Sequence, residues 1–174
     1  LGTAPQSLSM GTSAILYFHP GTTFNGDVVA TSGRMYFYGS TFNGAGTFTK
    51  TGVNTDHSQG GCVFQATTEF TNMSTGSLFL ADNGYDTYNG DLRVNSLSTG
   101  QIRFGNSAGG ATLANGRTIT VGAGGFNTGV LLLRNFTQVG STPQNLSLGT
   151  SATLYFYPGT TFNGDVVATS GRMY

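Results

Sequence analysis

Seventeen consecutive residues, PGTTFNGDVVATSGRMY, occur twice in this chain, at 20–36 and again at 158–174. The match extends over the whole of residues 1–36 and 139–174, which agree at 29 of 36 positions. Two copies this similar, at an offset of 138 positions, are tandem repeats. We therefore expect residues 1–174 to form one continuous repetitive segment, excerpted from a longer chain.

A weaker pattern recurs inside this long period, in stretches such as TTFNGDVV, STFNGAGT, TEFTNMST, DTYNGDLR and ATLANGRT. With a degenerate start near Thr137, six such units fill one period and average about 23 residues each. That length is typical of one coil of a parallel β-helix, whose coils stack because no coil buries its apolar face alone. The sequence thus predicts an all-β fold, a right-handed parallel β-helix (β-solenoid), since parallel crossovers are almost always right-handed.

Alternating apolar residues support this fold, because successive side chains of a strand point to opposite faces. Six segments share a small residue followed by two apolar residues at alternate positions, as in GRMYF, GCVFQ and GSLFL. Stacked, they predict one inward column of Leu16, Met35, Val63, Leu78, Ile102, Leu131 and Leu154. A second inward column is Phe18, Phe37, Gln65, Leu80, Phe104, Leu133 and Phe156. A β-sandwich also contains many short strands, but it does not explain columns at coil-length spacing.

Asn-Gly pairs recur at one place in the coil, as at Asn25-Gly26, Asn43-Gly44 and Asn89-Gly90. We expect a corner there that needs a residue at positive φ, a backbone conformation that glycine adopts freely. Stacked Asn side chains are also expected to hydrogen-bond from coil to coil.

The composition excludes several classes of partner. Only 8% of the residues are charged and the net charge is zero, so neither nucleic acid nor an anionic membrane is electrostatically favoured. No apolar run approaches the roughly 20 residues that span a bilayer. The single cysteine, Cys62, is expected to point outward and to lie near the surface, either as a free thiol, the favoured state, or in an intermolecular bridge.

One outward column is apolar and aromatic where a solvent face should be polar. Its members are Tyr17, Tyr36, Phe64, Phe79, Arg103, Leu132 and Tyr155. Four explanations stay open: the insertion 52–61 folds over this stripe, a neighbouring molecule packs laterally on it, carbohydrate stacks on its rings, or the register of the column is misassigned. The stripe is the candidate contact or glycan site.

Catalytic and metal sites are not predicted. Asp27 and Asp91 share a corner position but lie three coils apart, about 14 Å, which is too far for two carboxylates to act on one glycosidic bond. Asp82 and Asp86 flank a turn and resemble a short oxygen-rich cation loop, although a solvated turn is favoured. His57 lies in a polar loop without the spacing of metal ligands. We expect no enzyme activity, no cofactor and no metal.

The phrases TTFNGDVV, STFNGAGTFTKTG, ANGRTITVGAGGF and GVLLLRNFTQ resemble the tandem repeats of very large secreted surface proteins of Bacteroidota, including gliding-type adhesins. The resemblance covers the whole chain and concerns the style of the repeat, so it carries over no site residues. It implies an extracellular, cell-surface location and a role in a long stalk, fibre or adhesin that self-associates. The alternatives are a carbohydrate-binding adhesin shaft and, third, a polysaccharide-degrading β-helix enzyme.

Overall fold

The computed structural model describes residues 2–174, which form a solenoid of short, parallel strands. Three stacks of strands line its sides. No α-helix occurs among these residues, and so none is long and apolar enough to cross a membrane. The chain is thus an all-β, parallel β-helix, as the sequence predicts.

The longest stack, called sheet 1, contains one strand from every coil. Its strands are β1 (Gln6–Ser9), β4 (Val28–Ser32), β7 (Gly46–Lys50), β10 (Thr68–Asn72), β13 (Leu92–Ser96), β16 (Ile119–Phe126), β19 (Gln144–Ser147) and β21 (Val166–Thr169).

Sheet 2 is the layer that follows sheet 1 along each coil. It begins with the pair β2 (Ile15–Phe18) and β5 (Arg34–Phe37), and continues with β8 (Asp56–His57), β11 (Leu78–Leu80), β14 (Gln101–Phe104), β17 (Thr128–Leu133), β20 (Ser151–Phe156) and β22 (Arg172–Met173). Sheet 3 closes the coil with β3 (Thr23–Phe24), β6 (Thr41–Phe42), β9 (Val63–Phe64), β12 (Tyr85–Tyr88), β15 (Gly110–Leu113) and β18 (Phe136–Gln138).

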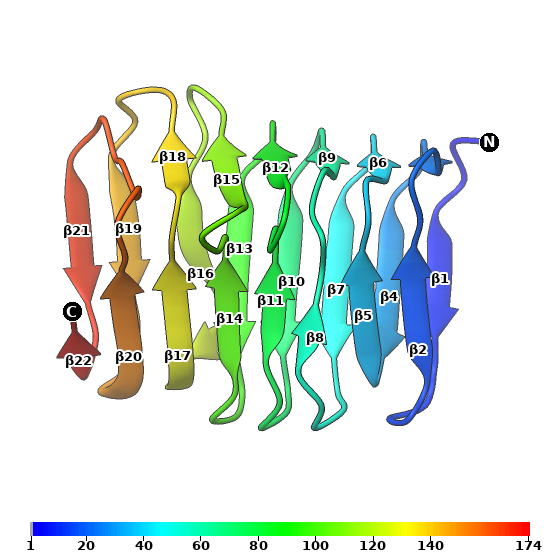
Figure 1. Cartoon of the computed structure of the whole chain (residues 1–174), viewed down its shortest axis with the longest axis horizontal. Coiled ribbons are helices and arrows are strands. Elements are labelled where there is room, and N and C mark those ends of the chain that lie inside the picture. The colour runs from blue at the N-terminus through cyan, green and yellow to red at the C-terminus, as the bar shows by residue number, and fades with distance from the viewer. Residues whose placement is uncertain (1) are drawn as a thin grey trace.

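The direction of the coil is visible in Figure 1. Strands of sheet 2 and then sheet 3 run upward on the near side, and strands of sheet 1 run downward on the far side. The chain advances from the N-terminus at the right to the C-terminus at the left, so the coil is right-handed.

The repeat contains a whole number of coils. Gln6 and Gln144 are equivalent residues of the two copies, and they open β1 and β19. In the strand order of sheet 1, the path from β1 to β19 passes through β4, β7, β10, β13 and β16, which makes six steps of one coil each. The register carries Gln6 through Val28, Gly46, Thr68, Leu92 and Ile119, and Thr120↔Asn145 then places Ile119 opposite Gln144. Six coils therefore return the chain to the equivalent residue.

The interior is filled by apolar side chains that stack along the axis. In sheet 3 the rings of Phe24, Phe42, Phe64 and Tyr88 follow one another with centroids 4.9–5.1 Å apart and planes within 5°. This distance is close to the spacing of hydrogen-bonded strands, so each coil adds one ring to the stack. Stacked aromatic pairs stabilise a core by more than the burial of their apolar area alone would.

The two predicted inward columns are confirmed except in the third coil. There, Asp56 and Ser58 occupy the positions expected for Val63 and Gln65, and both are fully buried. The segment 61–65 instead enters sheet 3, where Val63 pairs with Thr41 and Gln65 lies exposed at the following corner. Cys62 is consequently buried in the core rather than near the surface.

The Asn-Gly corners need glycine for a reason other than the predicted one. Gly116 has positive φ, but Gly26 and Gly90 do not. A Cβ atom on Gly90 would lie 2.1 Å from the carbonyl carbon of Ala66 in the preceding coil, so the glycine permits close backbone approach. The expected coil-to-coil amide bonds do form, since Asn43 Nδ2 donates to Asn25 Oδ1 at 2.6 Å and Asn89 Nδ2 donates to Gln65 Oε1 at 2.9 Å.

Candidate functional site

The aromatic stripe lies on the outer face of sheet 2. Strand registers pair Tyr17 with Tyr36 and run from His57 to Tyr155, and Tyr174 extends the column by stacking on Tyr155. Between Tyr36 and His57 the two strands are joined by side chains, since Asp56 and Ser58 accept the N–H groups of Met35 and Phe37. In coil order the aromatic stripe is Tyr17, Tyr36, His57, Phe79, Arg103, Leu132, Tyr155 and Tyr174. Six of the seven predicted members therefore do form one column.

Phe64 is the exception, and its assignment to the stripe is wrong. Its ring is fully buried between Phe42 and Tyr88 in sheet 3, and His57 takes its place in the stripe. The sequence pattern missed this because GCVFQ matches the apolar alternation of sheet 2, whereas the true strand contains a buried acid. The signal was Lys50, an inward-pointing cation in TFTKT that requires a buried anionic partner.

The insertion 52–61 does not cover the stripe. It provides β8 and thus joins sheet 2, where it contributes His57 to the aromatic face. The His57 side chain is 60% exposed. The explanation in which this segment folds over the stripe is therefore wrong.

The tyrosine rings at the two ends of the stripe cover one another. Tyr17 and Tyr36 stack with centroids 4.8 Å apart and planes 12° apart, and Tyr155 and Tyr174 repeat this pair at 4.7 Å and 13°. Because the ring faces are stacked along the axis, the outer surface consists of ring edges and hydroxyl groups. Burial raises the pKa of Tyr36, so this phenol stays protonated at neutral pH.

The centre of the stripe is polar. His57 Nδ1 lies 2.7 Å from Asp82 Oδ2, and Arg103 contacts the other oxygen of the same carboxylate. The Arg103 guanidinium also lies 3.7 Å from the centre of the Phe79 ring, in a cation–π contact. Asp82 is thus paired twice and nearly buried, which rules out the solvated turn expected from the sequence.

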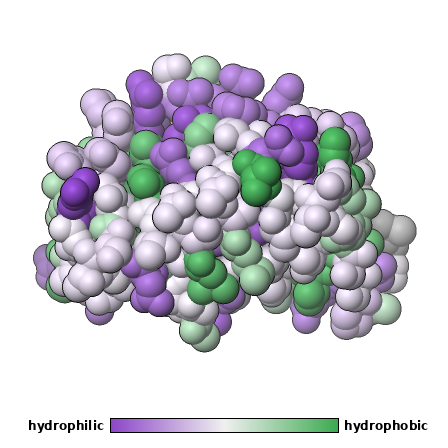
Figure 2. Space-filling model, turned by 90° about the horizontal axis from the view of Figure 1, so that it is seen from below, coloured by the Kyte–Doolittle hydropathy of each residue, from purple (hydrophilic) through white to green (hydrophobic). Residues whose placement is uncertain are grey.

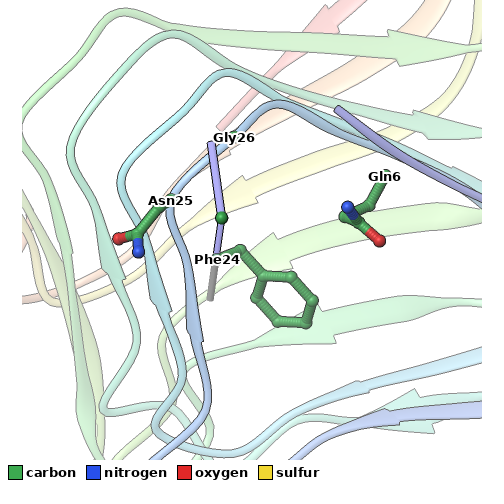
Figure 3. A pocket seen from close by; sticks show the side chains of 5 residues that line it. Gln6, Phe24, Asn25 and Gly26 are labelled. Carbon is green, nitrogen blue, oxygen red and sulfur yellow. The ribbon is translucent and has the colours of Figure 1, made fainter. Parts of the chain in front are cut away.

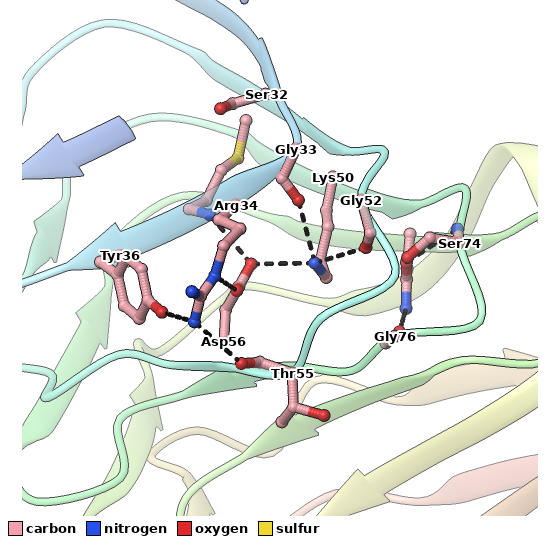
Figure 4. Close-up of polar contacts among 12 residues, drawn as sticks. Ser32, Gly33, Arg34, Tyr36, Lys50, Gly52, Thr55, Asp56, Ser74 and Gly76 are labelled. Atoms are coloured by element: carbon pink, nitrogen blue, oxygen red, sulfur yellow. Dashed lines mark hydrogen bonds and ion pairs between the residues drawn. The ribbon is translucent and has the colours of Figure 1, made fainter. Parts of the chain in front are cut away.

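A buried ion cluster lies beneath the N-terminal part of the stripe (Figure 4). The Asp56 carboxylate accepts hydrogen bonds from Arg34 Nε at 2.9 Å and from the Met35 backbone N–H at 2.9 Å, and it pairs with Lys50 Nζ at 3.0 Å. The Lys50 ammonium also donates to the carbonyl oxygens of Gly33 and Gly52. Burial lowers the pKa of Lys50, and the neighbouring Asp56 opposes that shift. Asp56 and Lys50 are fully buried, so this cluster fixes the path of the third coil.

Asp86 and Cys62 form a second buried pair, inside sheet 3. Asp86 Oδ1 accepts the Cys62 backbone N–H at 2.9 Å, while within residues 2–174 neither Asp86 Oδ2 nor the Tyr88 hydroxyl oxygen has a hydrogen-bond partner. Burial raises the pKa of Asp86 to about 7 and that of the Cys62 thiol to about 12. A thiol that stays protonated and enclosed is chemically inert.

The acidic residues singled out in the sequence make contacts within the fold. Asp27 and Asp91 each accept a backbone N–H from the following coil, those of Ala45 and Thr118, and so they bridge successive coils at the corner. Asp82 and Asp86 point to opposite sides, one to the stripe and one to the core. Among residues 2–174, no group of three His, Cys, Asp or Glu side chains converges as a metal site would require.

The exposed apolar surface outside the stripe is scattered. Figure 2 shows the lower face of the molecule, where hydrophobic residues form separate spots among weakly polar and hydrophilic ones. Exposed apolar residues such as Val53, Met73 and Leu97 belong to the turns that join sheet 1 to sheet 2. Isolated apolar side chains of this kind are normal on protein surfaces.

Comparison with known proteins provides no relative that would assign a function to these features. No protein-family model matches the chain, and no match was found among curated proteins or solved structures. The candidate site therefore rests on the geometry of this chain alone: a stripe on one face of a parallel β-helix that carries stacked tyrosines at both ends and a polar centre.

Proposed function

We propose that this chain is a structural segment of a long, stiff rod, of the kind that forms extracellular stalks, fibres and surface adhesins. The observation that carries the proposal is the agreement between one sequence repeat and six whole coils. Because the repeat contains a whole number of coils, the next repeat begins at the same point of the coil. All three sheets can therefore continue from one repeat into the next. The number of repeats then sets the length of the rod.

The mechanical properties follow from the way the coils are joined. Each coil hydrogen-bonds to its neighbours through parallel strands, and the corners add bonds such as those of Asp27 and Asp91. Each coil contacts only the coils beside it, so stiffness accumulates along the axis as it does in other solenoid proteins. A low content of charged residues also limits self-repulsion along the rod.

The location is part of the proposal. The likeness of TTFNGDVV and related phrases to repeats of large secreted Bacteroidota surface proteins supports an extracellular, cell-surface setting. A rod that holds a binding tip away from a cell needs length and rigidity, and it needs no catalytic residues of its own.

The first test is the length of the rod. We expect proteins with two, three and four tandem periods to lengthen by about 29 Å per period, because each period adds six coils at about 4.8 Å. Small-angle X-ray scattering measures this increment through the maximum dimension of each protein. Compact particles whose maximum dimension does not rise linearly with repeat number would contradict the rod.

The second test concerns the aromatic stripe, which we propose as a lateral contact between rods. Tyr157 flanks the stripe, with its ring centroid 5.7 Å from that of Tyr155. Replacing Tyr17, Tyr155 and Tyr157 with serine removes exposed or half-exposed rings without touching the core. We expect the parent to associate in sedimentation velocity runs and the variant to remain a folded monomer. The matched control is Val29→Ser with Val53→Ser, which removes apolar surface elsewhere and should leave association unchanged.

Carbohydrate binding is the second candidate function. The corner where Tyr17, His19, Tyr36 and Tyr38 meet offers several hydroxyl groups close together, which favours a polar ligand. Stacking of sugars needs an open ring face, however, and the faces of the Tyr17–Tyr36 pair cover each other. Lateral protein contact through ring edges is therefore the function that this geometry supports better.

A further inference from the structure

The chain contains six Asn-Gly pairs, and in each of them a backbone nitrogen lies next to a side-chain amide that it can attack. The nitrogen of the residue after an asparagine can bond to the carbonyl carbon of the asparagine side chain and displace ammonia, a reaction called deamidation. Glycine hinders this attack least, because it has no side chain. The pairs begin at Asn25, Asn43, Asn83, Asn89, Asn115 and Asn163.

Five of the pairs are held by hydrogen bonds to a neighbouring coil. Figure 3 shows one of them, where the Asn25 side chain lies on the side of the corner away from the Phe24 ring. In a further pair the attacking nitrogen itself is engaged, because the Gly84 N–H donates to the Gln59 carbonyl at 2.7 Å. Each of the five must therefore open locally before it reacts. The side-chain bonds of the other four asparagines run from Asn43 Nδ2 to Asn25 Oδ1 at 2.6 Å, from Asn89 Nδ2 to Gln65 Oε1 at 2.9 Å, and from Asn163 Nδ2 to the Gln138 carbonyl at 2.7 Å.

The pair Asn115-Gly116 falls outside this ladder of side-chain amides. Tyr88 pairs with Leu113 in sheet 3, and the Ala114 N–H then donates to the Tyr88 carbonyl at 2.9 Å. Ala114 thus takes the ladder position in this coil, and Asn115 comes one residue later. Among residues 2–174, no hydrogen bond holds the Asn115 side chain, which lies against the backbone of Gly140.

The same pair forms the tip of an exposed turn. Asn115 and Gly116 are its two central residues, and the Arg117 N–H closes it by donating to the Ala114 carbonyl at 3.2 Å. Gly116 has a φ of +76°, and nothing lies within 4 Å of the place where its Cβ atom would be. Both central residues are exposed, so solvent reaches the reacting groups. Because one long hydrogen bond closes the turn, it opens more easily than the ladder.

We infer that Asn115 is a site of spontaneous deamidation. Water or hydroxide takes the proton of the Gly116 N–H, and this nitrogen then bonds to Cγ of Asn115. The Cγ–Nδ2 bond breaks, and the amide group leaves as ammonia with a proton from water. The product is a succinimide ring, which a water molecule opens at either of its two carbonyl carbons to give aspartate or isoaspartate. In total, one water is consumed and one ammonia is released.

Deamidation at this turn changes the charge of the rod rather than its fold. The product adds one carboxylate to a chain whose net charge is zero. In a rod of many periods the new charge recurs once in every six coils, always at the same corner. This property goes beyond the proposed rod function, because it makes the surface charge depend on the age of the protein.

Two aspartate variants separate the turn from the ladder. Asn115→Asp should leave the midpoint of urea unfolding unchanged, since the side chain has no hydrogen bond to lose. Asn163→Asp should lower the midpoint, because a carboxylate cannot donate to the carbonyl oxygens of Gln138 and Val139. Equal midpoints for the two variants would contradict the difference between turn and ladder.

The test is peptide mapping by mass spectrometry after the folded chain has been incubated at mildly alkaline pH. Trypsin cleaves after Arg103 and Arg117, so Asn115 is recovered in the peptide 104–117, whose mass rises when an amide becomes a carboxyl group. We expect Asn115 to react at least about tenfold faster than any other Asn-Gly pair, because those pairs require local opening. Asn115→Gln should abolish the mass gain, which separates Asn115 from Asn106 in the same peptide.

The matched control is the same chain in concentrated urea, where all six pairs are expected to react at similar rates. The inference fails if Asn115 keeps its amide, or if a pair in the ladder reacts as fast in the folded chain. It also fails if the preference for Asn115 is as large in urea, since the flanking residues and not the turn would then cause it. Circular dichroism establishes that the chain stays folded during incubation. None of these readouts depends on rod length or lateral contact.

Discussion

Replacing Asp56 with alanine is expected to lower the free energy of unfolding by about 3–5 kcal/mol, the usual cost of leaving one member of a buried ion pair without its partner. Lys50 is fully buried and keeps only the carbonyl oxygens of Gly33 and Gly52 as partners in this variant. Arg34 is 29% exposed and can turn its charge to solvent. Urea unfolding followed by circular dichroism measures the loss.

Two controls separate the charge of Lys50 from the loss of packing. The double variant Asp56→Leu with Lys50→Met removes both buried charges and should recover most of the lost stability. The Asp56→Ala variant should also regain stability at alkaline pH. The folded-state pKa of Lys50 is lowered by burial, so the unfolded chain binds more protons and stability rises with pH until the unfolded lysine titrates. If Asp56→Ala lowers the free energy of unfolding equally at neutral and at alkaline pH, the buried charge of Lys50 is not the cause of the loss.

Replacing Asp86 with asparagine is expected to stabilise the protein by about 4 kcal/mol at pH 8 and to leave it almost unchanged at pH 4, because about 1.4 kcal/mol accompanies each unit of pKa shift. Burial raises the pKa of Asp86 from 3.8 to about 7. Between these values the folded state retains a proton that the unfolded chain has lost. The free energy of unfolding therefore falls by about 1.4 kcal/mol per pH unit as the pH rises from about 4 to about 7, and it is constant above that range.

Asparagine is neutral at every pH, so its side chain removes this dependence while its oxygen still accepts the Cys62 N–H. The measurement is a series of urea unfolding curves for both proteins from pH 4 to pH 8. The difference between the two proteins isolates Asp86, because every other titrating group is shared. If the two proteins show the same pH dependence of the free energy of unfolding, folding does not raise the pKa of Asp86.

Much of the fold was predictable because its signals are local. The alternation in segments such as GSLFL and GQIRF identifies strands with one buried face, and the fully buried Leu78, Leu80 and Ile102 confirm it. The duplication and its division into six similar units predict both the solenoid and the number of coils per repeat. Most of the aromatic stripe followed from the same register.

The third coil was not predictable in this way. Two segments competed for its place in sheet 2, and local alternation favours GCVFQ over the strand that contains Asp56 and His57. The outcome depends on Lys50 and Arg34, which supply the charges that make burial of Asp56 tolerable. The coil brings these charged side chains together from different parts of the sequence. Their pairing therefore cannot be predicted from the alternation of residues in a short segment.

The sequence by itself determined the period, the coil length and the alternation of buried and exposed side chains, because each depends on a local pattern of residues that recurs along the chain. Only the tertiary structure decided that Phe64 belongs to the core, that His57 faces outward, and that the glycines of most Asn-Gly corners serve close backbone contact rather than positive φ. Those outcomes depend on distances between successive coils. The physical reason is that a coil's neighbours, about 4.8 Å away in space, lie a whole coil away in the chain.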